Sequence, residues 1–266
     1  MPPLRVSLIQ GATRWHDAAG NRDYYGALVR PLRRSTDLVV LPETFLSGFT
    51  NETLDNAETM QGAGVQWLRE LACEVDAVVT GSLIVRDGAD RCVNRLIWMR
   101  PDGSHEQYDK RHLFRMAHEH ERYVGGNQRL IVDLVGWRIC PMVCYDLRFP
   151  VWMRNRYDRS AERFDYDLSL FVANWPAARR HAWRTLLRAR AIENLSYCVG
   201  VNRIDTDGNG IAYAGDSAAF DFLGQPLVEF GAHEQVATVA LDADALGAHR
   251  THFPAWMDAD AFDLRT

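Results

Sequence analysis

Short apolar runs that alternate with helix-like segments constrain the fold of this 266-residue chain more than any other feature. Runs rich in Val, Leu and Ile predict buried strands, and apolar residues at helical spacing predict helices. The expected strands span residues 6–10, 37–43, 77–85, 93–99, 129–135, 137–143, 167–173, 196–203, 217–222 and 236–241. The expected helices span residues 18–34, 62–73 and 182–193, with a further helix after Arg148. This alternation predicts an α/β chain of mixed sheets flanked by helices, and the absence of a Pro/Gly/Ser-rich linker favours one domain.

The composition is that of a compact globular protein, with 47% hydrophobic residues, 24% charged residues and a formal charge of -5. Basic and acidic residues are interspersed, so the chain lacks the basic stripe of a nucleic-acid-binding protein. Residues 4–10 are too short and too polar for the apolar part of a signal peptide, and no later apolar run could span a bilayer. We therefore expect a cytoplasmic protein with neither a nucleic-acid nor a membrane partner.

The five cysteines are odd in number, widely scattered and without a Cys-x-x-Cys pair. A disulfide framework and a zinc-thiolate site are therefore not expected. His118 and His120 could place two metal ligands on one face of a strand, but the neighbouring sequence supplies no obvious further ligands. The sequence consequently predicts no metal site.

Cys144 is the residue with the clearest chemical signal, because it follows the apolar run 137–143 and precedes an expected helix. Backbone N–H groups at such a strand-to-helix turn can stabilise a thiolate and the oxyanion made by its attack. A buried structural cysteine is the alternative interpretation. A redox sensor is another, for which Cys140 would be the nearby resolving cysteine, although it is expected inside the sheet.

Glu43 and Lys110 share this position after an expected strand. Side chains at the carboxyl ends of neighbouring strands in an α/β sheet converge on one crevice, so Glu43, Lys110 and Cys144 are expected to meet. A carboxylate, an ammonium and a thiol can together catalyse acyl transfer. The alternatives are that Glu43 caps a loop and that Lys110 is one cation of the basic turn 110–112.

Three segments together resemble the signature blocks of the nitrilase superfamily of carbon–nitrogen hydrolases. They are Leu-Pro-Glu-Thr-Phe at 41–45, Tyr-Asp-Lys-Arg-His-Leu-Phe at 108–114 and Val-Cys-Tyr-Asp-Leu-Arg-Phe-Pro at 143–150. The resemblance implies a four-layer α-β-β-α sandwich, a catalytic triad of Glu43, Lys110 and Cys144, and dimers that stack sandwich on sandwich. We expect a carbon–nitrogen hydrolase domain at residues 1–242 and a C-terminal tail at 243–266.

The family also has a second glutamate between its lysine and cysteine blocks, and Glu119 and Glu121 are the two candidates. The glycine that usually follows favours Glu119, while Arg122 makes Glu121 the better surface ion. In the implied mechanism Lys110 favours the Cys144 thiolate and Glu43 takes the thiol proton. The backbone N–H of Tyr145 and the Lys110 ammonium then hold the oxyanion, and no cofactor is required.

The choice of substrate depends on a narrower resemblance. Residues 144–150, 45–49 and 174–176 are similar to the ω-amidase branch, which hydrolyses the terminal amide of 2-oxo dicarboxylic monoamides such as 2-oxoglutaramate and 2-oxosuccinamate. Such a substrate needs a cation for its carboxylate, which Arg148 could supply unless it forms an ion pair on a helix face. The expected substrate-binding residues are Tyr145, Arg148, Phe49, Asn174 and Trp175.

Other activities of the superfamily would use the same triad: an aliphatic amidase, an N-carbamoyl amino acid hydrolase or a nitrilase. A non-catalytic regulatory or scaffold protein on the same fold is a further alternative, against which the intact triad argues. The tail carries Phe253, Trp256 and Phe262 among acidic residues, so it covers its own domain or a neighbouring subunit. Its aromatic density favours a subunit contact, and hence a homodimer or higher homo-oligomer.

Overall fold

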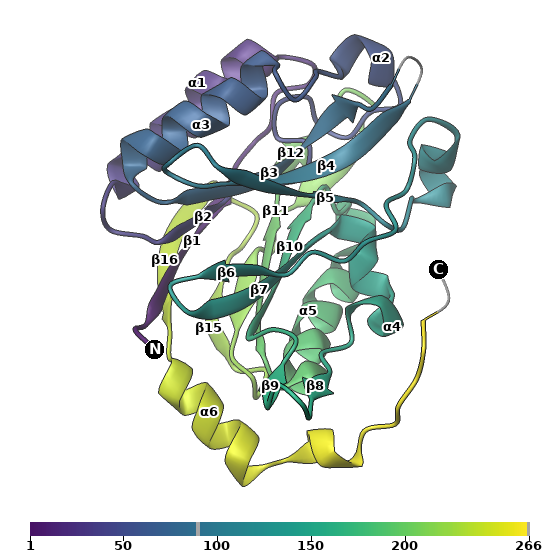
Figure 1. Ribbon diagram of the computed structural model, residues 1–266. Coiled ribbons are helices and arrows are strands. Elements are labelled where there is room, and N and C mark those ends of the chain that lie inside the picture. Colours follow the sequence, from purple (N-terminus) through teal and green to yellow (C-terminus); the bar gives the residue numbers. More distant parts are fainter. Residues whose placement is uncertain (89–90, 265–266) are drawn as a thin grey trace.

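The computed structural model describes residues 1–88 and 91–264, and it consists of two sheets packed face to face with helices on both outer faces (Figure 1). The first sheet has six strands in the order β16-β1-β2-β3-β4-β5. Their bounds are β16 (Gln235–Leu241), β1 (Leu4–Gln10), β2 (Leu38–Val40), β3 (Val78–Arg86), β4 (Cys92–Met99) and β5 (His105–Asp109). Neighbours in the run β1-β2-β3 are parallel, and the other neighbours are antiparallel.

The second sheet also has six strands, in the order β15-β14-β11-β10-β7-β6. Their bounds are β15 (Pro226–Glu229), β14 (Ala218–Phe220), β11 (Tyr197–Asn202), β10 (Leu168–Ala173), β7 (Trp137–Val143) and β6 (Val132–Leu134). The central strands β7, β10 and β11 are parallel and buried along their length, as their continuous apolar sequences predict. Two short ribbons lie outside the sheets: β12 (Ile204–Thr206) with β13 (Ala212–Ala214), and β8 (Tyr157–Asp158) with β9 (Arg163–Phe164).

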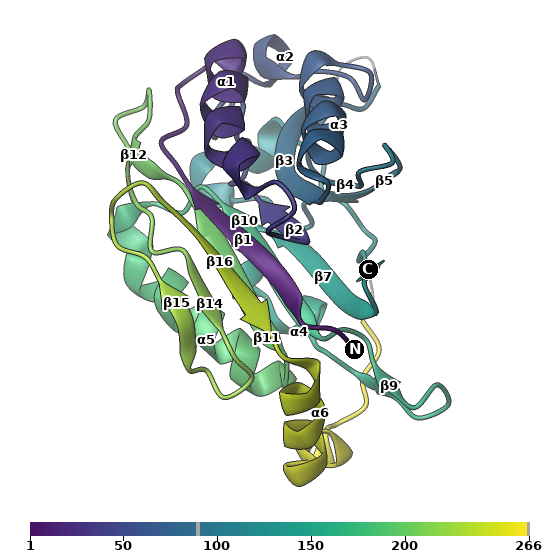
Figure 2. The ribbon, with the colours of Figure 1, turned by 90° about the vertical axis from the view of Figure 1, so that its left-hand side faces the viewer.

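Helices cover the outer face of each sheet. The helices α1 (Ala18–Val29) and α3 (Ala63–Val75) lie on the first sheet, and α5 (Arg180–Asn194) lies along the second (Figures 1 and 2). The short helices α2 (Thr53–Asn56) and α4 (Pro150–Met153) lie near the edges. One apolar core fills the space between α1, α3 and the first sheet, and a larger core lies between the two sheets and beneath α5. The predicted four-layer α-β-β-α sandwich is therefore confirmed.

Several expected elements end earlier than their apolar sequence suggests. The strand expected at 37–43 ends at Val40, because Pro42 has no N–H to continue the ladder, and Glu43 lies in the turn that follows. The strand expected at 129–135 is reduced to β6, where Val135 (φ 52°) and Gly136 (φ 87°) form a tight turn. The helix expected after Arg148 is only α4, and the residues before it, Cys144–Arg148, form a 3₁₀ turn.

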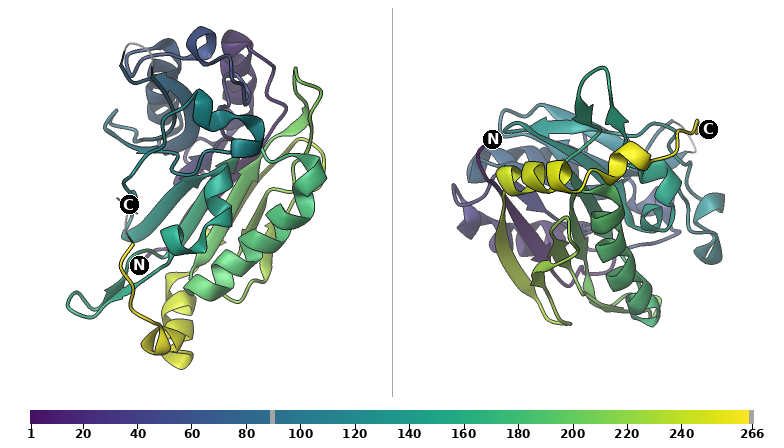
Figure 3. Two further views of the ribbon diagram at one scale, coloured as in Figure 1. Left: turned by 90° about the vertical axis from the view of Figure 1, so that its right-hand side faces the viewer. Right: turned by 90° about the horizontal axis from the view of Figure 1, so that it is seen from below.

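The C-terminal segment packs on its own domain at one end of the sandwich (Figure 3). Helix α6 (Ala243–His252) begins at Asp242, whose carboxylate accepts hydrogen bonds from the first-turn N–H groups. Arg250 binds the Asp167 carboxylate at 2.6 Å, and the Trp256 ring lies 3.9 Å from that of Tyr157. Phe253 and Phe262 remain 56% and 38% exposed. Within the described residues, no helix has the length and apolarity needed to cross a membrane.

Candidate active site

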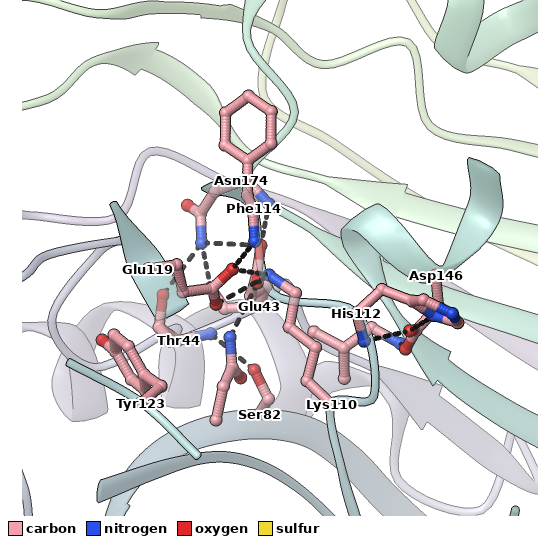
Figure 4. Close-up of polar contacts among 12 residues, drawn as sticks. Glu43, Thr44, Ser82, Lys110, His112, Phe114, Glu119, Tyr123, Asp146 and Asn174 are labelled. Atoms are coloured by element: carbon pink, nitrogen blue, oxygen red, sulfur yellow. Dashed lines mark hydrogen bonds and ion pairs between the residues drawn. The ribbon is translucent and has the colours of Figure 1, made fainter. Parts of the chain in front are cut away.

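Four strand ends from the two sheets meet at one place. Glu43 follows β2, Lys110 follows β5, Cys144 follows β7, and Asn174 follows β10. Strand β5 is antiparallel to β4, which is antiparallel to β3, so its carboxyl end lies at the same end of the sheet as that of β2. The side chains of Glu43, Lys110 and Glu119 point toward one another there, and Asn174 lies beside them (Figure 4). The strand-end argument correctly predicted that Glu43 and Cys144 lie together. For Lys110 it was wrong in detail, because the strand expected at 93–99 ends at the opposite end of the sheet and Lys110 is placed by β5, a strand that the sequence analysis did not predict.

The Glu43 carboxylate is completely buried and held from three directions. Its Oε1 accepts hydrogen bonds from Lys110 Nζ at 2.9 Å and from Asn94 Nδ2 at 2.8 Å. Its Oε2 accepts one from the backbone N–H of Asn174 at 2.7 Å. Oε2 also accepts a longer contact of 3.5 Å from Asn174 Nδ2. Because both contacts to Oε1 are short, Oε2 is the better placed oxygen for a further proton.

Glu119, and not Glu121, reaches this cluster. The Lys110 ammonium donates to both Glu119 oxygens, at 2.9 and 3.0 Å, and Glu119 is fully buried. Glu121 is exposed and accepts a hydrogen bond from the His118 ring at 2.9 Å. Burial alone would lower the pKa of Lys110, but the Glu119 and Glu43 carboxylates outweigh it and raise that pKa well above its usual value. Burial raises the pKa of Glu119, and the Lys110 charge opposes that rise.

Cys144 sits on a strained turn. Its φ is 46°, in the left-handed region, and Thr44 beside Glu43 has φ 40°. This conformation costs about 1–2 kcal/mol for a residue with a Cβ. Burial first, and the Glu43 carboxylate second, raise the pKa of the Cys144 thiol well above its usual value, despite the opposing Lys110 charge. Lys110 therefore favours the thiolate, as expected, but burial and the Glu43 carboxylate act against it and favour the neutral thiol.

Asp146 connects the cysteine turn to the lysine loop, and sequence analysis overlooked it. Its buried carboxylate accepts hydrogen bonds from Val143 N (3.1 Å), Tyr108 Oη (2.8 Å), His112 N (3.0 Å) and His112 Nδ1 (2.7 Å). The His112 ring also stacks on Phe149 at 3.8 Å. Tyr108 and His112 belong to the signature segment at 108–114, and Val143, Asp146 and Phe149 belong to the segment at 143–150. That the polar partners are divided between these two segments was the signal that could have identified the contact.

A small cavity of about 50 Å³ lies over the cluster. All five expected substrate-binding residues line it: Phe49, Tyr145, Arg148, Asn174 and Trp175. Sequence analysis did not name the remaining lining residues, which are Phe114, Ala117, Pro176, Arg179, Ile211 and Tyr213. Trp175 is part of the hydrophobic core and also lines the cavity. It is 4% exposed, and its ring centroid lies 5.5 Å from that of Trp183. The Arg148 guanidinium lies over its ring, 4.9 Å from the centroid.

The two residues considered as metal ligands do not lie on a strand: His118 joins two 3₁₀ turns, and His120 lies in the second of them, Glu119–Glu121. Across residues 1–88 and 91–264, no group of three or more His, Cys, Asp or Glu side chains is arranged to hold a metal ion. All five cysteines are free.

This fold and this buried Glu-Lys-Cys arrangement define a class of enzymes that hydrolyse carbon–nitrogen bonds. The chain belongs to the carbon–nitrogen hydrolase family, whose model matches residues 5–251. The omega-amidase YafV of Yersinia enterocolitica is 44% identical over 266 residues, 99% of this chain and all of that protein. The 2-oxoglutaramate amidase of Bacillus subtilis is 30% identical over 228 residues, 85% of each chain.

Solved structures agree with this assignment. A CN-hydrolase superfamily protein from Xanthomonas campestris, with an arsenic adduct in its active site, has a TM-score of 0.97 and 57% identity over the whole of both chains. The Nit3 protein of Saccharomyces cerevisiae, a member of branch 10 of the nitrilase superfamily, has a TM-score of 0.84 with 24% identity over 95% of each chain. The resemblance to the nitrilase superfamily that the sequence predicted is therefore confirmed.

Proposed function

We propose that this protein is an ω-amidase, which hydrolyses the terminal amide of a short 2-oxo dicarboxylic monoamide such as 2-oxoglutaramate or 2-oxosuccinamate. The observation that carries the proposal is a buried carboxylate–ammonium–thiol cluster beneath a cavity with guanidinium groups in its wall. The names of the relatives in Yersinia enterocolitica and Bacillus subtilis support the same substrate class.

In the proposed mechanism, Cys144 is the nucleophile and Glu43 the base. Burial and the Glu43 carboxylate favour the neutral thiol, so its proton moves to Glu43 as the sulfur attacks the amide carbon. Oε2 is the oxygen with room for this proton, since Asn94 and Lys110 occupy Oε1. Glu43 then gives the proton to the departing nitrogen, ammonia leaves, and the acyl group remains as a thioester on Cys144.

The remaining steps use the same residues. The Lys110 ammonium and the backbone N–H of Tyr145 stabilise the oxyanion in both tetrahedral intermediates. Glu43 next takes a proton from a water molecule, which attacks the thioester carbon and releases the acid and the thiol. Glu119 keeps Lys110 charged and in place through its two hydrogen bonds. The transfer needs no metal or organic cofactor, because the thiol supplies the nucleophile.

We further propose that Arg148 binds the substrate carboxylate. Its guanidinium is stacked on Trp175 and has no ion-pair partner within the described residues, so its donors remain available. Phe49 and Trp175 supply apolar walls, and Asn174 orients Glu43.

A second candidate is an amidase for neutral amides. The mostly apolar lining of the cavity favours it, and the (R)-stereoselective amidase of a Pseudomonas species is 33% identical over 256 residues, 94% of this chain and 89% of that protein. The two candidates differ in whether the substrate carries a carboxylate.

Ammonia release from a substrate panel tests the proposal. The panel contains 2-oxoglutaramate, 2-oxosuccinamate, glutamine, an aliphatic amide, a nitrile and an N-carbamoyl amino acid, with Cys144→Ala as the control. We expect turnover of the 2-oxo monoamides above all others, and its loss in Cys144→Ala with an unchanged melting temperature. Preference for another compound would overturn the substrate, and full activity of Cys144→Ala would overturn the mechanism.

We also propose that the enzyme works in the cytoplasm as a homodimer. The exposed Phe253 and Phe262 support a subunit contact through the C-terminal segment at 243–266, while residues 1–242 form the catalytic domain. Light scattering after size-exclusion chromatography should give twice the mass of the chain, and a monomer at micromolar concentration would contradict this assembly.

A further inference from the structure

A second arginine, Arg179, lies in the wall of the active-site cavity together with Arg148. It ends the 3₁₀ turn Ala177–Arg179, which follows Asn174 and Trp175 after strand β10. Its guanidinium lies 5.0 Å over the Phe114 ring, and its Nη1 is 3.9 Å from the Met116 sulfur. A thioether is a weak acceptor, so the described residues leave the donors of this cation without a strong partner.

Trp175 links the two arginines. Its ring carries the Arg148 guanidinium on one face, and its Nε1 donates a hydrogen bond to the backbone carbonyl of Arg179 at 2.9 Å. Each guanidinium therefore lies over an aromatic ring, which restrains the position of the cation while most of its N–H donors have no strong partner among the described residues. Together the two guanidinium groups can donate hydrogen bonds to more oxygen atoms than the two of a single carboxylate.

The charges of the lining restrict which substrate fits. The cavity wall contains the cations Lys110, Arg148 and Arg179, and Glu43 is the only acidic residue among the described residues that line it. Lys110 and Asn94 already engage Oε1 of that glutamate. Because the charge of Glu43 is already paired with Lys110, an ammonium group on the substrate would meet two guanidinium groups without an unpaired acidic residue to offset them, whereas a keto oxygen would meet hydrogen-bond donors.

We propose that Arg179 is a specificity-determining residue that, with Arg148, binds the carboxylate and the adjacent 2-oxo group and rejects the corresponding 2-amino acid amide. This inference rests on the proposed function, because it concerns the substrate of the same site. It explains discrimination between 2-oxoglutaramate and glutamine by charge, since the two molecules differ only at that carbon.

Binding without turnover tests the inference directly. The probe is 2-oxoglutarate, the expected product, which has the same carboxylate and 2-oxo groups, measured by calorimetry on Cys144→Ala. Adding Arg179→Met should raise its dissociation constant by about 10- to 100-fold, the worth of a hydrogen bond between charged groups. Arg184→Met is the matched control, because Arg184 is an exposed arginine on the nearby helix α5 and lies outside the cavity wall.

Turnover gives a second readout. In Arg179→Met with Cys144 intact, the ratio of kcat/KM for 2-oxoglutaramate to that for the uncharged pentanamide should fall by at least about tenfold. The ratio for 2-oxoglutaramate against glutamine should fall in the same direction, and Arg179→Lys should restore part of it because the charge returns without the planar fork.

The outcomes separate this inference from the proposed function. Weak or absent 2-oxoglutarate binding that Arg179→Met does not change overturns the role of Arg179, and so does an equal loss on charged and neutral amides. Binding that depends on Arg179 supports the subsite even if 2-oxoglutaramate is not turned over, and that result would overturn only the proposed substrate.

Discussion

Replacing Asp146 by Asn should uncouple the cysteine turn from the lysine loop. The carboxylate accepts four hydrogen bonds, two on each oxygen: Oδ1 from His112 N and Nδ1, and Oδ2 from Val143 N and Tyr108 Oη. Asn has one acceptor oxygen, so its amide nitrogen must face one of the two pairs. In either orientation a backbone N–H, of His112 or of Val143, meets another donor and cannot turn away.

The cost can be worked out from these contacts. Two hydrogen bonds to a charged acceptor are lost, and each contributes about 1.5–3 kcal/mol, so the free energy of unfolding should fall by roughly 3–6 kcal/mol. For a chain of this size, about 1 kcal/mol corresponds to 2–4 °C, so the melting temperature should fall by at least about 6 °C. The loss of kcat should exceed the change in KM, because the displaced groups are Cys144 and Lys110.

Differential scanning fluorimetry and steady-state ammonia release measure the two effects on the same sample. Asp133→Asn is the matched control, because Asp133 lies exposed on the edge strand β6 and the same substitution there removes the same charge. A fall of less than about 3 °C with unchanged kcat would refute the reasoning, since it would mean that the four contacts contribute little net stability.

Two further predictions use the pKa directions of buried groups. Glu119 raises the pKa of Lys110, so Glu119→Gln should lower that pKa and move the alkaline limb of the kcat/KM profile to lower pH. The control Glu121→Gln, at the surface, should leave the alkaline limb in place. An unmoved limb in Glu119→Gln would argue against Glu119 as the partner of Lys110. Burial raises the pKa of the Cys140 thiol from 9.0 to about 12. The folded protein thus retains a proton that the unfolded chain loses, and stability falls as pH rises above 9; at pH 10 this costs about 1.4 kcal/mol. Urea unfolding at pH 8 and pH 10 measures this effect. Cys140→Ala should reduce the difference in stability between the two pH values by about that amount, and the control Cys73→Ala, at an exposed cysteine, should not. Equal differences in both variants would contradict the pKa shift.

The sequence predicted most buried strands and the meeting of Glu43 and Cys144 because both depend on local patterns, whereas Lys110 follows β5, whose sequence is not apolar and which was not predicted. Continuous apolar runs indicated buried parallel strands, and a polar residue directly after such a run indicated the edge where strand ends meet. The boundaries were less accurate where one residue ended an apolar run, as at Pro42, or where two residues of positive φ formed a turn, as at Val135 and Gly136. The apolar content of a segment does not determine the backbone conformation of its individual residues.

The cavity wall could not be predicted in the same way. Phe114 and Arg179 come from 3₁₀ turns and irregular loops, and Ile211 and Tyr213 come from the hairpin β12–β13, which pairs with neither main sheet. No periodic pattern identifies such residues, since their place depends on tertiary packing. The raised pKa of Cys144 could not be predicted for a related reason: the sequence shows the nearby cation Lys110, but it does not show the burial that opposes its effect.

The arrangement of Glu43 shows why this chemistry needs two sheets. Its Oε2, the oxygen proposed to act as base, is held by the N–H of Asn174, which follows β10 of the second sheet, while Glu43 itself follows β2 of the first. Cys144, the proposed nucleophile, follows β7 of the second sheet. The 2.7 Å contact between Glu43 and Asn174 therefore exists only when the inter-sheet core sets the two sheets at the correct separation. Because well-packed cores resist small displacements, the packing of the larger core is itself what aligns the base with the nucleophile.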